Sequence, residues 1–503
     1  MQFVKHPLIR PNKIEVRRYQ ENILNSAVKK NILCVLPTGL GKTTIAILLA
    51  VHRLEKYPDS KIMITAPTRP LCSQHQKLFS ECLRIPEEKI VLITGKISPK
   101  KRKEIYKNAK IICETPQTIK NDIENEILDL SNFSLIVFDE VHRAVGNYAY
   151  PFIAKFYKSK SKYPKILGLT ASPGSTKEKI EEICKNLFIE GVEIRSEYDE
   201  DVEPYVKKIE TEFIKINLPE DLKSIQETLK NALKRRLERL KEYNIHIKTK
   251  KELLETQKKI SKKISIGKKP ILFYILSLLV ESIKIWHLLE LLETQSVKAA
   301  KIYLQKIKKG KTRSDKNVLK DPEFQKALFK IEKVGEHPKI EKLKEVIRKE
   351  LKEKEKKIIV FSHYRDNIRH LYELLNEICN PAILIGQAGE GGLTQKEQIN
   401  IIKDFNLGVY NCLITSPIGE EGLHIPSADI AIFYDTVPSE IRAIQRRGRV
   451  GRTKVGKVIF LITKGTRDES YYWSAYRKEK KMKKMLREMQ KKTQSSVKDF
   501  LEV

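Results

Sequence analysis

The segment ILCVLPTGLGKTTIAILLAVHRL, residues 32–54, decides the fold. Its first part is a short apolar run typical of a buried strand, and its last part has apolar residues at helical spacing. The loop between them contains Gly39 and Gly41, followed by a lysine and two threonines. A glycine loop between a strand and a helix directs backbone N–H groups toward phosphate groups. The segment therefore predicts a nucleotide-binding α/β domain.

Within this loop, Lys42 is expected to reach the β- and γ-phosphates of ATP, and the Thr43 hydroxyl to ligate Mg²⁺. The strict form of the pattern has glycine where Leu36 stands. The residues expected to bind the cofactor here are Leu36, Pro37, Thr38, Gly39, Leu40, Gly41, Lys42, Thr43 and Thr44.

An acidic motif ends a second apolar run, LIVFDEVH at residues 135–142. Asp139 is expected to hold Mg²⁺, mostly through water, and Glu140 to activate the attacking water. His142 would couple the nucleotide site to the nucleic-acid side. The alternative for the acidic pair is a helix cap, which the apolar strand ahead of it disfavours.

A basic motif lies near the other end of the chain, IQRRGRVGR at residues 444–452. Arginines three apart on a helix share one face, so Arg449 and Arg452 can point together at a γ-phosphate held by another domain. Gln445 would lie beside the attacking water. The expected catalytic residues are Lys42, Glu140, Gln445, Arg449 and Arg452.

Apolar runs alternate with helical patterns in two separate blocks of the chain. The runs lie at 32–36, 62–66, 91–94, 111–115, 135–140 and 166–172, and again at 358–362, 382–386, 412–416, 430–434 and 458–463. Continuous apolar strands separated by helices predict parallel sheets covered on both faces. We expect an α/β chain with two parallel-sheet domains, at 1–202 and 338–503.

The stretch 203–337 lacks this rhythm and has long helical patterns rich in Lys and Leu. It carries 32 Lys+Arg against 18 Asp+Glu, about twice the charge density of the rest of the chain. We expect an inserted, all-helical, basic domain. A basic helix at 477–492 would either cap the second domain or contact nucleic acid.

The whole chain has 97 Lys+Arg against 64 Asp+Glu, a net charge of +33. Lysine-rich surfaces also occur in thermophile proteins, but those usually gain both signs together, so the surplus favours a polyanionic partner. The seven scattered cysteines have no zinc spacing and indicate reduced thiols in the cytoplasm. The strongest apolar run, 271–280, is too short to span a bilayer.

These motifs in this order resemble a superfamily-2 helicase, which implies two RecA-like domains. RRYQ at 17–20 resembles the element in which a glutamine reads adenine, so Gln20 would do so, with Arg17 and Tyr19 nearby. The resemblance implies nucleic-acid contacts from Pro67, Thr68, Arg69, Thr94, Gly95, Thr115, Pro116, Gln117, Ser362, His363, Thr415 and Ser416. It implies coupling roles for His142, Thr170, Ser172, Gly419 and Gly422.

Finer matches narrow the resemblance to archaeal Hef and the Fanconi-anaemia group M helicases. They are VFDEVHRAVGNYAY at 137–150, HLLELLETQ at 287–295 and KGTRDESYYW at 464–473. That family implies a motor working on forked, branched or four-way DNA in repair and fork restart, with the helical insert gripping the branch. It would act in the cytoplasm, near the nucleoid in a prokaryote.

Several features depart from the family pattern. His424 stands where the family has an aspartate on the ribose, so the resemblance does not carry that contact over. Val141 and Val450 replace common Ala and Thr residues. Family members often continue into a nuclease module, whose site is absent here; a helicase-only fragment and a helicase-only protein both stay open, as do partner repair proteins.

Two other functions compete with a DNA helicase. Dicer and the innate-immune RNA sensors share this ATPase lineage and carry a helical insert, which allows an ATPase stimulated by double-stranded RNA. A protein of another class would be a DNA clamp that uses ATP only as a switch. Lys42, Glu140 and the paired arginines argue against the clamp.

Overall fold

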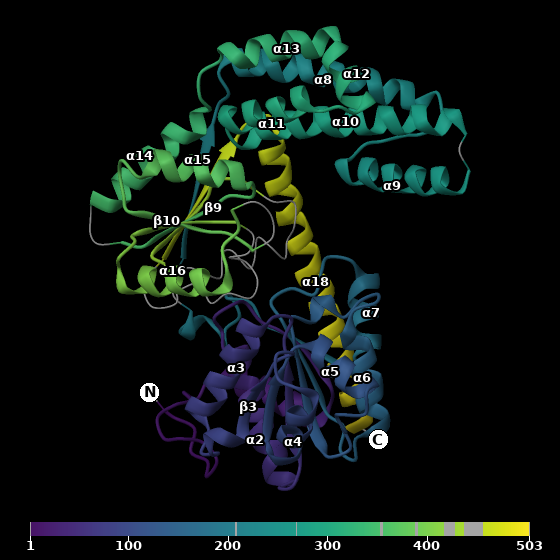
Figure 1. The fold of residues 1–503 in the computed structure, drawn as a ribbon. Helices are drawn as coiled ribbons and strands as arrows, with labels where there is room; N and C mark the ends of the chain where they lie inside the picture. Colours follow the sequence, from purple (N-terminus) through teal and green to yellow (C-terminus); the bar gives the residue numbers. More distant parts are fainter. Residues whose placement is uncertain are drawn as a thin grey trace.

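The computed structural model describes residues 2–206, 209–267, 269–352, 356–387, 391–416, 428–436 and 456–501, with side chains described as far as residue 491. Figure 1 shows an α/β domain at the bottom, a second α/β domain at the left and a helical bundle at the top. A long C-terminal helix, in yellow, runs from the upper bodies down to the lower domain.

The first domain contains a parallel sheet in the order β3-β4-β2-β5-β6-β1-β7. Its strands are β1 (Ile32–Val35), β2 (Lys61–Thr65), β3 (Ile90–Ile93), β4 (Ile111–Glu114), β5 (Phe133–Asp139), β6 (Ile166–Thr170) and β7 (Gly191–Ile194). Its helices are α1 (Arg18–Lys29), α2 (Lys42–Lys56), α3 (Arg69–Cys82), α4 (Pro99–Asn108), α5 (Pro116–Glu124), α6 (Ala149–Lys160) and α7 (Lys177–Asn186). The six predicted strands of this block are confirmed, and β7 is an additional edge strand.

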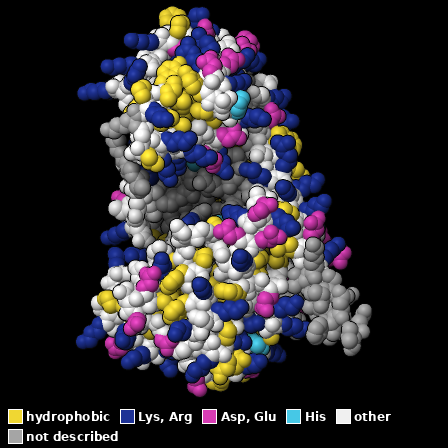
Figure 2. Space-filling view, turned by 90° about the vertical axis from the view of Figure 1, so that its right-hand side faces the viewer, with side chains coloured by type: hydrophobic (Ala, Val, Ile, Leu, Met, Phe, Trp, Pro, Cys, Tyr) yellow, Lys and Arg dark blue, Asp and Glu magenta, His cyan; other side chains and the backbone are white. Residues whose placement is uncertain are grey.

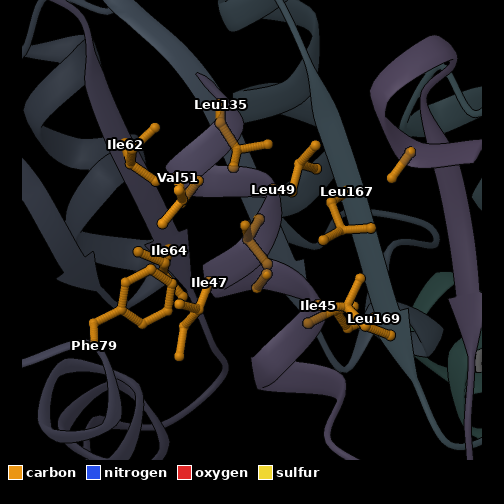
Figure 3. Packing of buried hydrophobic residues seen from close by; sticks show 14 of the residues in the cluster. Ile45, Ile47, Leu49, Val51, Ile62, Ile64, Phe79, Leu135, Leu167 and Leu169 are labelled. Atoms are coloured by element: carbon orange, nitrogen blue, oxygen red, sulfur yellow. The ribbon is translucent and has the colours of Figure 1, made fainter. Parts of the chain in front are cut away.

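Helix α2 is fixed to this sheet by close apolar packing (Figure 3). The side chains in contact come from α2, from three strands and from α3: Ile45, Ile47, Leu49, Val51, Ile62, Ile64, Phe79, Leu135, Leu167 and Leu169. Full burial of one such side chain stabilises the fold by about 1.5–3 kcal/mol. The packing therefore fixes the start of α2, where the phosphate loop ends.

The second sheet is also parallel, in the order β10-β11-β9-β12-β13-β8. Its strands are β8 (Ile209–Ile216), β9 (Ile358–Phe361), β10 (Pro381–Leu384), β11 (Cys412–Thr415), β12 (Ile430–Phe433) and β13 (Gly456–Thr463). The helices described with it are α14 (Pro338–Lys352), α15 (Arg365–Leu375) and α16 (Gln395–Leu407). The five strands predicted for this block are confirmed.

Strand β8 corrects the expectation that residues 203–337 are all helical. It pairs with β13 along eight residues, at the edge of the second sheet. Its sequence IETEFIKI mixes charged with apolar residues, and Phe213 is 43% exposed while stacking on Phe460. An edge strand with one face toward solvent has no continuous apolar run. A strand prediction that relies on apolar runs therefore does not find β8.

The helical insert consists of α8 (Glu220–Lys241), α9 (Lys250–Ile266), α10 (Pro270–Thr294), α11 (Val297–Lys309), α12 (Arg313–Lys320) and α13 (Pro322–Lys333). Helix α10 is central and packs against α8, α9, α11 and α12. The prediction of a helical body between the two sheets is confirmed for this range.

Helix α10 is long and apolar enough to cross a membrane by length and composition alone, so the prediction based on the shorter run 271–280 underestimated it. Its charged residues, however, pair with neighbouring elements. The pairs are Glu281–Arg236, Lys284–Asp315, Glu290–Lys250 and Glu293–Arg467. Such pairing is the arrangement of a core helix in a bundle, where buried charges need partners.

The C-terminal helix α18 (Arg467–Leu501) joins all three bodies. At its start, the Arg467 guanidinium lies 2.7 Å from Glu293 of α10. Farther along, Met482 and Leu486 are buried in the core of the first domain, and Arg487 lies 2.9 Å from Asp199. The basic helix expected at 477–492 thus packs on the first domain, an arrangement that neither sequence alternative included.

The docking of α18 makes a first prediction. Leu486→Ala should weaken the attachment by about 2–5 kcal/mol, because it removes a buried side chain and leaves a cavity. Trypsin should then cut the lysine-rich part of α18 faster than in the parent protein. Lys484→Ala, on the exposed side of the same helix, is the control. Equal cleavage of the Leu486 variant and the parent would contradict the docking.

Candidate ATP and nucleic-acid site

The phosphate loop lies at the carboxyl end of β1, and α2 begins at Lys42. Gly39 and Gly41 have φ angles of 94° and 73°, which favour glycine. A Cβ atom on Gly41 would lie 2.5 Å from the amide nitrogen of Gln20. The Lys42 ammonium donates a hydrogen bond to the Leu36 carbonyl at 3.0 Å. The loop therefore brings an ammonium group and a helix N-terminus together, as a phosphate site requires.

The residues expected to read adenine meet this loop. The Tyr19 hydroxyl donates to the Leu40 carbonyl at 2.8 Å, and the Gln20 amide nitrogen lies 3.4 Å from the same oxygen. Arg17 donates to the Tyr19 hydroxyl at 3.4 Å. The ring of Tyr205 lies 5.7 Å from that of Tyr19 and 5.3 Å from the Arg17 guanidinium. No sequence motif identifies Tyr205, which borders the group.

The acidic pair lies at the end of β5, on the same edge of the sheet. Glu140 has a φ of 51° and its backbone N–H donates to the Asp139 carboxylate at 2.9 Å. Its own carboxylate lies 3.3 Å from Nδ1 of His142, and the Tyr150 hydroxyl donates to the Asp139 carbonyl at 2.6 Å. A left-handed non-glycine residue costs on the order of 1–3 kcal/mol and is often functional.

A histidine of α3 also contacts the acidic pair. Nε2 of His75 lies 2.8 Å from the Asp139 carboxylate, and both side chains are buried. Burial alone would raise the pKa of Asp139, but the hydrogen bond with His75 and the charge of Lys42 hold it below its usual value. Asp139 is therefore ionised at neutral pH, as a ligand for a hard cation must be.

Helical spacing could have identified His75. It shares the buried face of α3 with Cys72 and Phe79, three and four residues away. A histidine on an apolar face needs a buried partner, although the sequence does not show that the partner is Asp139. Tyr150 lies within the segment 137–150, but its hydrogen bond to the acidic motif has no sequence signature.

The segment TASPG follows β6 and forms a tight turn. The backbone N–H of Ser172 donates to the Thr170 hydroxyl at 3.1 Å. The Ser172 hydroxyl lies 3.0 Å from the sulfur of Met482 on α18. The segment expected to couple nucleotide and nucleic acid thus touches the helix that comes from the second domain.

The nucleic-acid residues expected in the first domain gather at the carboxyl ends of β2, β3 and β4, which are neighbours in the sheet. They are Pro67, Thr68, Arg69, Thr94, Gly95, Thr115, Pro116 and Gln117. A Cβ atom on Gly95 would lie 3.9 Å from Arg69 and 4.0 Å from Thr118. Helices α3 and α5 begin at Arg69 and Pro116, and helix N-termini attract phosphates.

The corresponding residues of the second domain are less open. The side chains of Ser362 and Thr415 are fully buried, and the Thr415 hydroxyl donates to the Leu384 carbonyl at 3.0 Å. The His363 backbone N–H donates to Asp435 at 2.6 Å, and Ser416 is mostly buried. The hydroxyls of Ser362 and Thr415 thus form hydrogen bonds within the second domain in this arrangement, and their predicted contacts with nucleic acid stay predictions.

The remaining predicted residues lie outside the described part of the chain. They are Gly419, Gly422, His424, Gln445, Arg449, Val450 and Arg452. Their predicted roles stay predictions.

Three family descriptions match consecutive parts of the chain. "DEAD/DEAH box helicase" matches residues 17–180, "Putative ATP-dependent RNA helicase, helical bundle" matches 221–337, and "Helicase conserved C-terminal domain" matches 338–454. The matched order is the order of the first sheet domain, the helical insert and the second sheet domain.

Known proteins similar to the chain include the crystal structure of the Pyrococcus furiosus Hef helicase domain, at 43% identity and a TM-score of 0.73. The similarity covers 93% of this chain and 100% of that one. A Methanocaldococcus jannaschii protein, "Putative ATP-dependent RNA helicase MJ1505", is 44% identical over 97% of this chain and 63% of its own length. The mouse Fanconi anemia group M protein homolog is 30% identical over 92% of this chain and 25% of its own length. The chain thus spans less than two thirds of these two full-length relatives.

Beneath the nucleic-acid residues of the first domain lies a buried polar cluster. Arg102 forms two hydrogen bonds with Asp122, and the Tyr106 hydroxyl lies 2.8 Å from both Asp122 and Glu114. A hydroxyl has one proton, so it can donate to Asp122 and accept from a protonated Glu114. Burial raises the pKa of Glu114 to about 8.

This cluster predicts a dependence of stability on pH. Between about pH 4.5 and 8, folded Glu114 keeps a proton that the unfolded chain has lost, so stability falls as pH rises, by at most about 1.4 kcal/mol per pH unit. Thermal unfolding of Glu114→Gln should lack this decline, and Glu104→Gln, on the exposed side of α4, should keep it. A decline that persists in the Glu114 variant would contradict the assignment.

Proposed function

Because the chain belongs to the helicase family of Hef and the Fanconi anaemia group M proteins, we propose that it is an ATP-dependent DNA helicase or translocase. Its proposed substrates are forked or branched DNA in repair and replication-fork restart. The observation that carries the ATPase part is the meeting of Gln20, the phosphate loop and the Asp139–Glu140 pair at one edge of the first sheet.

The residues at this edge fit a nucleotide with its magnesium ion. Lys42 would hold the β- and γ-phosphates, and the loop can approach them closely because Gly39 and Gly41 have no side chains. Thr43 and the ionised Asp139 would hold Mg²⁺, which neutralises phosphate charge when bound. Glu140 would accept a proton from the attacking water.

The second domain would complete the site. Gln445, Arg449 and Arg452 would face the γ-phosphate from across the cleft between the sheets, an arrangement worth several orders of magnitude in rate. Gly419 and Gly422 would take part in coupling. Because α18 starts in the second domain and touches Ser172 in the first, it offers a covalent path between the two halves.

DNA would bind along both sheets. The helix N-termini beside Arg69 and Gln117 would hold backbone phosphates, which fix position without reading sequence. The helical insert, part of the segment 203–337 with its surplus of 14 positive charges, would grip the branch. The 43% identity with the Hef helicase domain over 93% of the chain supports this choice.

A second candidate is an ATPase stimulated by double-stranded RNA. The helical-bundle description that matches 221–337 and one 44% identical relative both carry the name of an RNA helicase. A DNA clamp that does not hydrolyse ATP is disfavoured by the intact set of Lys42, Asp139 and Glu140.

Turnover tests the catalytic assignment. Glu140→Gln should keep ATP binding and lower turnover by at least about a hundredfold, because it removes the carboxylate that activates water but leaves the phosphate loop intact. Lys42→Ala should weaken ATP binding as well. Phosphate release and binding of a fluorescent ATP analogue separate the two effects. Parental turnover in the Glu140 variant would refute the assignment.

The substrate is tested by ATPase stimulation. Single-stranded, duplex, forked and four-way DNA should be compared with double-stranded RNA at equal nucleotide concentration and fixed salt. We expect forked and four-way DNA to stimulate turnover most. Stronger stimulation by double-stranded RNA would favour the second candidate, and equal stimulation by linear and branched DNA would remove the branch preference.

A further inference from the structure

The outer tip of the helical insert exposes an unusual set of apolar side chains. At this tip the end of α9 meets the start of α10. Ile266 is 90% exposed, Ile271 44%, Phe273 46% and Tyr274 40%. Figure 2 looks onto this side of the molecule and shows a hydrophobic patch on the upper body, with Lys and Arg side chains and some Asp and Glu side chains around it. We name these four residues the apolar tip.

The tip is not the loose end of a poorly packed hairpin. Leu253 and Ile260 of α9 are buried against Ile275, Leu278 and Leu279 of α10. Tyr274 also packs edge to face on Tyr243, with the ring centroids 5.9 Å apart. The two helices therefore form a firm support that presents the exposed side chains outward.

Exposed lysines surround this tip. Lys258, Lys259, Lys262, Lys263 and Lys269 are exposed and form no ion pair with any residue in the described part of the chain. Among the described residues, none neutralises these charges through an ion pair. Contiguous apolar surface on a soluble protein marks a binding site, and the lysines select a polyanion as the partner.

A DNA branch point offers both negatively charged phosphates and an exposed apolar base-pair face. The interior of a linear duplex presents phosphates but hides the faces of its bases in the stack, whereas a fork leaves the face of the base pair at its branch point open. Phenylalanine, isoleucine and leucine side chains are the ones that proteins insert against base steps, and aromatic rings stack on bases of any sequence. The apolar tip therefore fits a junction better than it fits a continuous duplex.

We propose that the apolar tip is the branch-sensing element, with Ile266, Phe273 and Tyr274 packing on the open base pair of a DNA junction while the surrounding lysines hold the phosphates. This inference rests on the proposed function, because it names the part of the insert that recognises the branch. The apolar contacts supply the preference for branches, and the lysines supply affinity for any duplex.

The test compares binding of the full chain to a fork and to a linear duplex of the same sequence and length, with all duplex ends except the branch point closed by hairpin loops, by fluorescence anisotropy between 50 and 300 mM salt. Ile266→Ser with Phe273→Ser should lower the preference for the fork roughly tenfold, since apolar and stacking contacts are lost, without changing the salt dependence. Phe273→Trp should keep the preference. Phe329→Ser is the matched control, because Phe329 is 61% exposed beside Lys333 in the same bundle.

The lysines are tested separately. Lys262→Gln with Lys263→Gln should weaken fork and duplex binding equally and reduce the slope of log affinity against log salt by about two. All replaced side chains are exposed, so thermal unfolding should match the parent and exclude misfolding as a cause.

Three outcomes of this test would contradict the proposal. If the variant with Ile266→Ser and Phe273→Ser keeps the fork preference of the parent, the apolar tip is not the sensor, and the proposed function is unaffected. No fork preference in the parent overturns both. A parent that sediments as a dimer and a variant that sediments as a monomer would make the patch a contact between copies, or a protein-docking site, and overturn the proposal.

Discussion

A buried ion pair between Lys339 and Asp468 is the interaction on which the arrangement of the upper two bodies depends. Both side chains are fully buried. The Lys339 ammonium also donates to the Thr294 carbonyl at the end of α10, and Asp468 accepts from Thr436. The pair thus joins the last turn of α10, the start of α14, the end of β12 and the start of α18. Removing one partner of such a pair costs about 3–5 kcal/mol, because the other charge stays buried without compensation.

The segments that extended the family resemblance beyond the nucleotide motifs meet at this junction. HLLELLETQ and KGTRDESYYW lie far apart in sequence, yet Glu293 pairs with Arg467, and the Tyr471 hydroxyl donates to Glu290 at 3.2 Å. Burial alone would raise the pKa of Glu290, but His287 and Lys250 lower it to about 2. The segments therefore attach the insert to the second sheet. The first domain contacts this unit through α18, so one continuous helix links the second domain to Ser172.

Sequence reasoning predicted the interior of both sheets because their strands are continuous apolar runs, and the phosphate loop because its chemistry is local. It missed β8, where apolar residues such as Phe213 are mixed with charged ones. It also missed the docking of α18, because Leu486 is buried in the core of a domain that lies almost 300 residues earlier in the chain. His75 beside Asp139 is similar: helical spacing shows a buried histidine, but only the fold shows its partner. In the second domain, Ser362 and Thr415 were located correctly at strand ends, although the sequence could not show that their hydroxyls turn inward.

Helix α10 shows why composition alone misjudges a binding surface. Its sequence ILFYILSLLV is one apolar run. A count of charges over the insert therefore suggests that the lysines bind the partner and that the apolar residues only form the core. The residues of the run differ in burial: Leu278 and Leu279 are buried, whereas Ile271, Phe273 and Tyr274, one or two turns earlier, are 40–46% exposed. Hydrophobic area left in water costs about 25 cal/mol per Å², so a free chain carries these side chains at a disadvantage that a partner would remove. In the proposed function the lysines would hold any polyanion, and the uncovered apolar surface beside them would distinguish one DNA shape from another.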